Sequence, residues 1–369
     1  MDHKARQQRL QKALSPHHLD ALLVTHLPNV RYLCGFTGSA GALLVSGTKS
    51  VFFTDGRYTD QARAEVQAAR IVITREGPMA GAADWLSVQQ KAGRRASSAS
   101  GTRVGIEGEH LTVAARSRLA KLLPSGVRLR EAPPLVEEGR LIKDEQEIQC
   151  IRSAVLLGAS LFDRALETIR PGVLETEVAA EMEYAARSAG AQAMSFDTII
   201  ASGKRSALPH GRASRTAIPS QGFVVCDFGV ILSGYCSDMT RTVYVGRASA
   251  EARKVYQAVK QAQQAGVDAV RPGISVGEVD KAARKSLQKS GLAKYFTHST
   301  GHGVGLEIHE APRLAAGQAE ILRPGMVITI EPGVYVPGKW GVRIEDMVVV
   351  TEQGCEVLTP TSKELVEIS

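Results

Sequence analysis

The chain has 369 residues, of which 44% are hydrophobic, and it carries a formal net charge of +7. This length favours two domains with a substantial buried core. No apolar run reaches the ~18 residues of a membrane-spanning helix, and the polar N-terminus does not resemble a secretory signal. We therefore expect a soluble, cytoplasmic protein.

The distribution of charge and cysteine argues against two other classes. The basic surplus lies in residues 1–140, which hold 20 Lys and Arg against 12 Asp and Glu. These basic residues are scattered without interleaved aromatic side chains, which favours a solvated surface over nucleic-acid binding. The five cysteines are widely spaced and form no CxxC pair, so neither a zinc ribbon nor a disulfide framework is indicated.

Residues 1–135 alternate between strand-like and helix-like segments, which predicts an α/β domain. The predicted elements are strands over 19–26, 70–76, 102–109 and 126–132, a hairpin over 41–55, and helices over 57–69 and 110–123. The segment "EAPPLVEEGR", with its proline pair and charged flank, favours a boundary. We place a linker over 136–142 and a second domain over 143–369.

The second domain begins with a long amphipathic helix, predicted over 143–169, and contains an internal duplication. Residues 169–190 align with residues 270–291 at a constant offset of 101, and each copy has Arg-Pro-Gly followed by a helical stretch. Each copy is later followed by an apolar strand that ends in an acid, "GFVVCD" and "GMVITIE". This pattern predicts two similar α/β halves with a functional site between them.

Four acids lie at or inside apolar strands, from both halves of this domain: Asp227, Asp238, Glu331 and Glu345. A buried carboxylate costs several kcal/mol unless it is paired or coordinated. The same strands supply only Arg241 and Arg343 as positive charges. Two divalent cations would balance four carboxylates, and His302 between two glycines could add an imidazole ligand.

These residues lie in motifs that resemble the pita-bread (M24) metallopeptidases: "DFGVILSGYCSD", "STGHGVGLEIHE", "ITIEPGVY" and "GVRIEDMV". The family's ligand order of Asp, Asp, His, Glu and Glu falls on Asp227, Asp238, His302, Glu331 and Glu345. The resemblance covers about 230 residues from 140 onward. It implies a pita-bread catalytic domain, and no dinucleotide or P-loop glycine pattern offers a competing interpretation.

The resemblance also implies how the ligands divide between the metals. Asp227 would bind one metal, Asp238 and Glu345 would bridge both, and His302 and Glu331 would complete the shell of the other. The metals would generate hydroxide from a shared water to attack the scissile carbonyl, with Glu331 as proton shuttle. Mn²⁺ is the expected metal, although Co²⁺, Fe²⁺ and Zn²⁺ accept the same ligands.

Five further residues are candidates for contact with the substrate. The resemblance gives His309 the role of stabilising the tetrahedral intermediate, and His210 that of a second catalytic histidine. His298, Arg313 and Arg343 are predicted to bind substrate. For His298 a local structural role is an equal alternative, Arg313 could meet a substrate carboxylate or lie on the surface, and Arg343 could pair with an acid.

The N-terminal segments "NVRYLCGFTGSAGALLV" and "FFTDGRYTDQA" resemble the creatinase-type domain of aminopeptidase P and prolidase. This resemblance implies cleavage of Xaa-Pro bonds in short peptides by a homodimeric enzyme. We predict an Xaa-Pro aminopeptidase, with an Xaa-Pro dipeptidase as the alternative. Creatinase and non-catalytic pita-bread modules that bind protein partners typically lack the metal ligands, so both are disfavoured.

Overall fold

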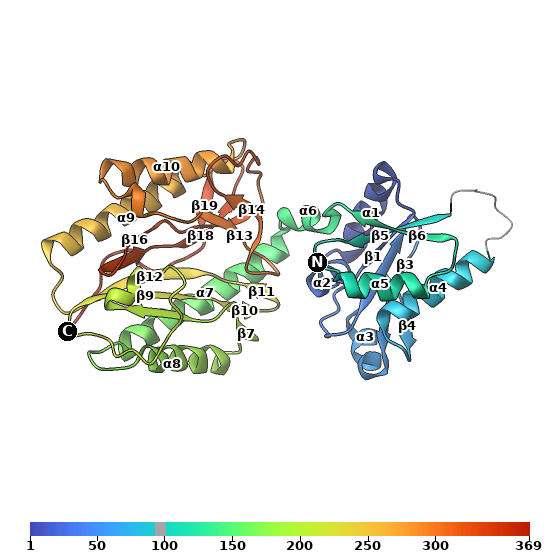
Figure 1. The fold of residues 1–369 in the computed structure, drawn as a ribbon, viewed down its shortest axis with the longest axis horizontal. Coiled ribbons are helices and arrows are strands. Elements are labelled where there is room, and N and C mark those ends of the chain that lie inside the picture. Colours follow the sequence, from blue (N-terminus) through green and yellow to red (C-terminus); the bar gives the residue numbers. More distant parts are fainter. Residues whose placement is uncertain (93–100) are drawn as a thin grey trace. The chain divides into compact units, whose positions relative to one another are not determined.

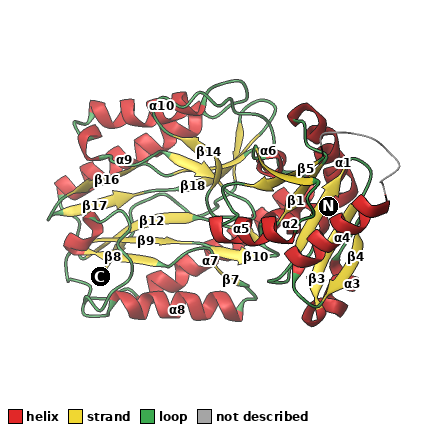
Figure 2. Ribbon diagram, turned by 45° about the vertical axis from the view of Figure 1, so that its right-hand side comes forward, coloured by secondary structure: helices red, strands yellow, loops and turns green. Residues whose placement is uncertain are grey.

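The computed structural model describes residues 1–92 and 101–369, which form two compact units, residues 1–140 and 141–369 (Figure 1). Both units combine helices with β-sheets (Figure 2). The segment predicted as a linker, 136–142, coincides with helix α6 (Leu135–Leu141), at whose end the two units meet in sequence. The predicted α/β fold class with a duplicated second domain is confirmed.

The N-terminal unit is built on one mixed sheet of six strands in the order β4-β3-β2-β1-β5-β6. Its strands are β1 (Ala21–Val24), β2 (Ala42–Ser46), β3 (Ser50–Asp55), β4 (Arg70–Thr74), β5 (Thr102–Glu107) and β6 (Val127–Ala132). Strand β2 pairs antiparallel with both β1 and β3, while β1, β5 and β6 run parallel. The central strands are buried along nearly their whole length because helices cover the sheet.

The helices predicted over 57–69 and 110–123 are both present, and this unit also has helices near residues 3, 27 and 78 that were not predicted. In chain order the helices are α1 (His3–Leu14), α2 (Leu27–Cys34), α3 (Thr59–Glu65), α4 (Pro78–Ala92) and α5 (Val113–Leu122). The predicted helix over 57–69 is shorter, since α3 ends at Glu65 and Val66 has extended backbone. Helix α2 ends at Cys34 and is capped by Gly35, whose positive φ of 85° is a conformation that residues with a side chain rarely adopt.

The C-terminal unit contains two structurally similar halves. Its helices are α7 (Glu145–Thr168), α8 (Glu175–Ser188), α9 (Ala250–Ala269) and α10 (Val276–Lys289). Both bounds of α10 lie 101 residues beyond those of α8, and so does the end of α9 beyond that of α7. The predicted internal duplication is therefore present at the level of whole helices.

Each half also contributes three antiparallel neighbouring strands. In the first half the order is β8 (Ile199–Ser202), β9 (Gly222–Phe228) and β12 (Met239–Val245). In the second half it is β13 (Gly301–Gly303), β15 (Val327–Ile330) and β18 (Asp346–Val350). Helices α7 and α8 lie along one side of these strands, and α9 and α10 along the other (Figure 1).

Shorter strands complete the C-terminal unit: β7 (Ala193–Met194), β10 (Val230–Leu232), β11 (Tyr235–Cys236), β14 (Glu310–Leu314), β16 (Gly333–Val336), β17 (Trp340–Arg343), β19 (Cys355–Val357) and β20 (Glu367–Ile368). The 3₁₀ segment η3 (Gly203–Ala207) follows β8 and contacts β17. Within the described ranges, 1–92 and 101–369, no helix combines the length and apolar character needed to cross a bilayer.

Candidate metal centre

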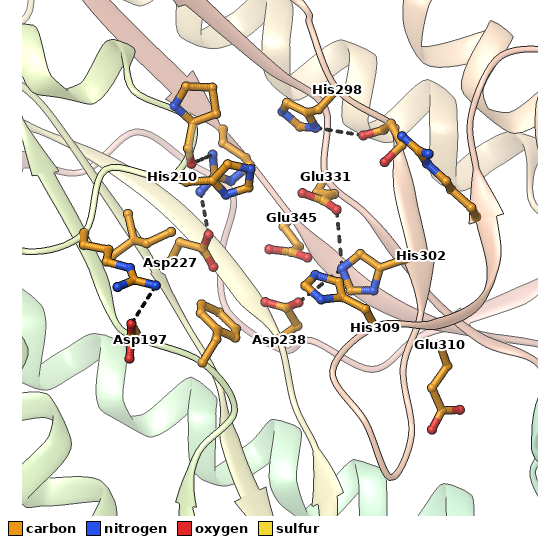
Figure 3. Close-up of a pocket in the computed structure, with 17 residues that line it drawn as sticks. Asp197, His210, Asp227, Asp238, His298, His302, His309, Glu310, Glu331 and Glu345 are labelled. Carbon is orange, nitrogen blue, oxygen red and sulfur yellow. Dashed lines mark hydrogen bonds and ion pairs between the residues drawn. The ribbon is translucent and has the colours of Figure 1, made fainter. Parts of the chain in front are cut away.

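The four predicted acids lie at matching strand ends in the two halves. Asp227 is the penultimate residue of β9, and Asp238 directly precedes β12, its antiparallel neighbour. In the second half Glu331 directly follows β15 and Glu345 directly precedes β18. Their side chains line one cavity of about 650 Å³, where they point toward one another (Figure 3).

His302 lies on β13 and faces two of these acids. Its Nε2 is 3.6 Å from Asp238 Oδ2 and 3.6 Å from Glu331 Oε1. Its Nδ1 lies 3.0 Å from the carbonyl oxygen of Gly303, and because a carbonyl only accepts, Nδ1 carries the proton. Burial lowers the pKa of His302 to about 4, so the ring is neutral at pH 7 and its Nε2 lone pair faces the carboxylates.

Three of the four acids have a buried oxygen without a hydrogen-bond partner among the described residues: Asp227 Oδ1, Asp238 Oδ1 and Glu345 Oε1. Such atoms are rare in folded proteins because desolvation without compensation costs about 1–3 kcal/mol or more. Asp238, His302 and Glu345 also offer ligand atoms that all lie within 4.8 Å of one another. Unpaired carboxylate oxygens beside an imidazole lone pair fit divalent cations.

The pKa values of these acids show the cost of gathering them without cations. Burial, followed by repulsion from neighbouring carboxylates, raises the pKa of Asp238 and of Glu345 well above the usual range. Burial raises the pKa of Glu331 to about 8, although Arg343 opposes the shift. The cluster therefore favours positive charge, supplied either by protons or by metal ions.

Arg343 is the only Lys or Arg, within the part of the chain that the structure describes, that forms an ion pair with one of the four acids. Its Nη2 donates to Asp227 Oδ2 at 2.5 Å, and both side chains are largely buried. Its Nη1 donates to Tyr335 Oη and to the carbonyl of Pro209. The ion pair with Asp227 agrees with the alternative prediction from sequence that Arg343 pairs with an acid. The prediction that Arg343 binds substrate stays a prediction.

His298 has protein partners on both ring nitrogens. Nδ1 lies 2.8 Å from the carbonyl oxygen of Ser299, so it carries the proton, and Tyr335 Oη then donates to Nε2 at 2.9 Å. Burial lowers the pKa of His298 to about 4, which matches this neutral tautomer. His298 lines the cavity, but this arrangement favours the structural alternative over the predicted substrate contact.

The other predicted residues lie on the walls of the same cavity. His309 is exposed, and its ring centroid is 4.4 Å from that of His302. Its pKa is lowered, first by burial and then by the nearby His210. His210 and Arg313 are also exposed and line the cavity. Arg313 lies opposite His302 in the antiparallel pairing of β13 with β14.

Arg241, the second basic residue of the acid-bearing strands, points away from the cavity. Its guanidinium is buried, pairs with Asp346 at 2.7 Å, and donates to the carbonyls of Thr361 and Ser362. It also donates to the backbone carbonyl of Glu345. Arg241 therefore supports the strand behind the site and does not neutralise the acid cluster.

Sequence reasoning missed several residues that shape the site. Thr240 Oγ1 donates to Glu345 Oε2 at 2.7 Å and accepts from Arg343 Nε at 3.1 Å. Thr240 lies two residues after Asp238 on an apolar strand, so the sequence alone indicates that both side chains are on the same face. Tyr335, which contacts Arg343 and His298, carried no such signal. Neither did Glu310, which lines the cavity and pairs with the distant Lys143 at 3.2 Å. The cavity lining also includes Phe196, Asp197, Ile199 and Arg212.

Comparisons with known proteins cover almost the whole chain. The model of Metallopeptidase family M24 matches residues 149–352, and that of the Creatinase/Prolidase N-terminal domain matches residues 6–142. The chain is 36% identical over 355 residues to an Xaa-Pro dipeptidase of Pyrococcus horikoshii, with 96% of each covered.

Solved structures give the same picture. An Xaa-Pro dipeptidase from Bacillus anthracis aligns with a TM-score of 0.93 at 39% identity, covering 99% of this chain and 100% of that one. An X-Pro aminopeptidase from Thermotoga maritima aligns with a TM-score of 0.85 at 33% identity, covering 98% of this chain and 99% of that one. The similarity thus extends through both units.

Proposed function

We propose that this chain, which belongs to metallopeptidase family M24, is an Xaa-Pro dipeptidase that requires two divalent cations. Membership of the family confirms the resemblance inferred from the motifs and makes the chain a hydrolase. The observation that carries the proposal is the convergence of unpaired carboxylate oxygens and the His302 lone pair on one cavity.

The choice of dipeptidase departs from the main prediction made from sequence, which was an Xaa-Pro aminopeptidase. Relatives 36% and 39% identical over nearly the whole chain are Xaa-Pro dipeptidases, and the aminopeptidase from Thermotoga maritima is 33% identical. The findings therefore support the alternative better than the main prediction. Both activities share the Xaa-Pro bond and differ in whether the peptide continues beyond the proline.

The proposed ligands are Asp227, Asp238, His302, Glu331 and Glu345. Four carboxylates and one imidazole form a mainly hard oxygen donor set, and we propose Mn²⁺ as the metal. Bound cations would activate a water near neutral pH and stabilise negative charge that develops on the scissile carbonyl oxygen. Asp227 would bind through Oδ1, which has no hydrogen-bond partner among the described residues, while Oδ2 keeps its contact with Arg343.

Residues on the cavity wall would move protons and hold the substrate. Glu331, next to the other proposed ligands, would take a proton from the attacking water and pass it to the leaving nitrogen. His309 is a neutral N–H donor next to the acid cluster, suited to the oxyanion that forms at the carbonyl. His210 shares this wall and is proposed as its partner in that role.

Arg313 provides the feature that suits a dipeptide. It is exposed on β14, opposite His302, and lines the cavity. In an Xaa-Pro dipeptide the proline carries a free carboxylate immediately after the scissile bond, and a guanidinium binds carboxylates in a bidentate manner. Longer peptides lack this carboxylate at that place, so Arg313 would favour dipeptides.

The proposal is tested by comparing hydrolysis of Ala-Pro with that of Ala-Pro-Ala by Mn²⁺-loaded protein. A dipeptidase hydrolyses Ala-Pro and leaves the tripeptide nearly intact, and Arg313→Met raises KM for Ala-Pro while the metal content is unchanged. Arg323→Met, at another exposed arginine, is the matched control. Faster hydrolysis of Ala-Pro-Ala would restore the aminopeptidase interpretation, and a lack of bound metal and of activity would favour a binding module.

We also propose that the chain forms a homodimer, on the basis of the family resemblance. Light scattering coupled to size-exclusion chromatography measures the mass directly. A single species with the mass of the 39.5 kDa monomer would contradict this part of the proposal.

A further inference from the structure

The wall of the cavity next to Asp227 carries an exposed pair of opposite charges that none of the roles above uses. Arg212 Nη2 lies 3.0 Å from Asp197 Oδ2, and the side chains are 76% and 67% exposed. Both residues line the same cavity as the acid cluster. In Figure 3 Asp197 lies beyond Asp227, on the opposite side of the cluster from His302 and His309.

The backbone beneath this pair is firmly held. The buried carboxylate of Glu175 accepts hydrogen bonds from Ser202, Arg205 and Ser214. Arg205 donates in turn to the carbonyl of Arg212 at 2.7 Å. The backbone of Arg212 is thus held in place by hydrogen bonds, while the guanidinium of Arg212 is exposed to solvent at the cavity.

Asp197 is placed beside Arg212 by the adjoining strand. The N–H of Ala213 donates to the carbonyl of Thr198, which brings the two segments side by side. Ile199, two residues after Asp197, pairs with Asp227 across β8 and β9. Phe196 and Ile199 add apolar surface to the same part of the cavity.

Two positions on opposite sides of the acid cluster therefore carry charge available to a substrate. Arg313 lies on the His302 side, and the Asp197–Arg212 pair lies on the Asp227 side. If the proline carboxylate is held by Arg313, the residue before the scissile bond extends toward the pair. Its side chain would pack on Phe196 and Ile199 and end near the two charges.

We propose that Asp197 and Arg212 together allow the Xaa side chain of Xaa-Pro substrates to carry either charge, an inference that rests on the proposed function. Exposed ion pairs contribute little energy, so a charged substrate side chain can displace one partner and pair with the other. With both residues present, cationic and anionic side chains each find an opposite charge. Removal of either residue leaves a single charge and makes the site selective.

The experiment measures kcat/KM of Mn²⁺-loaded protein for Glu-Pro and Lys-Pro, with Ala-Pro as a neutral reference. Asp197→Asn should raise the Glu-Pro to Lys-Pro ratio by about 3- to 10-fold, the scale of an exposed charge pair that changes from repulsion to attraction. Arg212→Gln should lower the ratio by a similar factor. Both shifts should shrink in 0.5 M NaCl, since exposed charges are screened at roughly that ionic strength.

A matched control is Arg164→Gln, which breaks the exposed Arg164–Glu167 ion pair on α7 and should leave the ratio at its wild-type value. Unchanged ratios in both test variants would overturn the inference. So would an equal loss for all three dipeptides in Arg212→Gln, because Arg212 would then hold the substrate carboxylate. Failure of the proposed function is distinguishable, since the wild-type protein would then either leave Ala-Pro intact or hydrolyse Ala-Pro-Ala faster.

Discussion

The two halves of the C-terminal unit share a scaffold but not their chemistry. Strands β8 and β13 occupy corresponding positions, each beside the strand that carries the first acid of its half. At the offset of 101 that relates helices α8 and α10, Ala201 corresponds to His302. One half therefore provides a small buried side chain where the other provides the imidazole ligand.

The acids differ in a similar way. The first half supplies the shorter carboxylates, Asp227 and Asp238, and the second half supplies the longer Glu331 and Glu345. Duplication thus accounts for where the carboxylates lie, at the ends of equivalent strands. It does not account for the length of these side chains or for the histidine, because both differ between the two halves.

The largest effects on activity are expected from two single variants, each of which neutralises one acid of one half. Asp238→Asn and Glu345→Gln should each release metal and lower kcat/KM for Ala-Pro by about 10³-fold or more, because the cations contribute several kcal/mol to the reaction. Metal content is measured by elemental analysis of dialysed protein. If the first half held one cation independently, Glu345→Gln would retain it in full, and the shared centre inferred from the geometry would be wrong.

A smaller effect is expected for His309, which the second half alone supplies. His309→Ala should retain metal but lower kcat by about 10²- to 10³-fold, the usual cost of removing a donor to an oxyanion. The exposed His17 of the N-terminal unit provides the control, since His17→Ala should leave kcat unchanged. Loss of metal in His309→Ala would show that His309, and not His302 alone, is a ligand.

The sequence was most informative where a residue type was unusual for its surroundings. Carboxylates such as Asp227 and Glu331 at the ends of apolar strands are rare, and their cost led directly to the hypothesis of cations. The duplication was visible because helix starts and turns have local signals, such as the Arg-Pro-Gly turns before α8 and α10. Fold class and the central acids were therefore accessible from local pattern and elementary electrostatics.

Residues with ordinary surroundings could not be assigned. Asp197 and Arg212 are far enough apart in sequence that no local pattern links them, and only the tertiary structure places them side by side. Tyr335 joins Arg343 to His298 through contacts that span 8 and 37 residues. The sequence could propose an acid partner for Arg343, but the choice of Asp227 depends on how two strands from different halves approach each other.

The stability of metal-free protein should depend on pH through the carboxylates of both halves. Folding raises the pKa of Glu331 to about 8, and those of Asp238 and Glu345 also rise, so the folded state binds extra protons below these values. Stability is then lost as the pH rises. His298 and His302, with pKa values lowered to about 4, act in the opposite direction, but only below their ordinary value of 6.5.

The window from pH 6.5 to 8 therefore isolates the carboxylates. EDTA-treated protein should lose at least about 2 kcal/mol of unfolding free energy across it, roughly one proton over 1.5 pH units. Urea unfolding at several pH values measures this change, and saturating Mn²⁺ should remove it by replacing the protons. Glu331→Gln should make the profile of the metal-free protein less steep, because one of the three carboxylates with a raised pKa is removed. A profile that is flat for the wild type without metal would contradict the clustering of these acids.

The smallest effects concern the scaffold that both halves share. The N–H of Leu174 donates to Glu177 Oε2 at 2.7 Å, and the N–H of Ser275 donates to Glu278 Oε2 at 3.3 Å, at equivalent helix starts. Each carboxylate also lies in the first turn, where the helix dipole favours negative charge. Glu177→Ala and Glu278→Ala should each lower the free energy of unfolding by about 0.5–1 kcal/mol. The decrease should be larger for Glu177→Ala, because the hydrogen bond of Glu177 is shorter.

Urea unfolding of the Mn²⁺-loaded protein measures both variants under conditions that keep the acid cluster neutralised. Glu181→Ala, at an exposed position further along α8, is the control for loss of an acidic side chain. Metal content should be unaffected in all three, because the capping residues belong to the repeated scaffold and not to the centre. A loss of metal in only one capping variant would mean that the helix start of that half also positions its ligands. In that half the repeated scaffold and the metal centre would then not be independent.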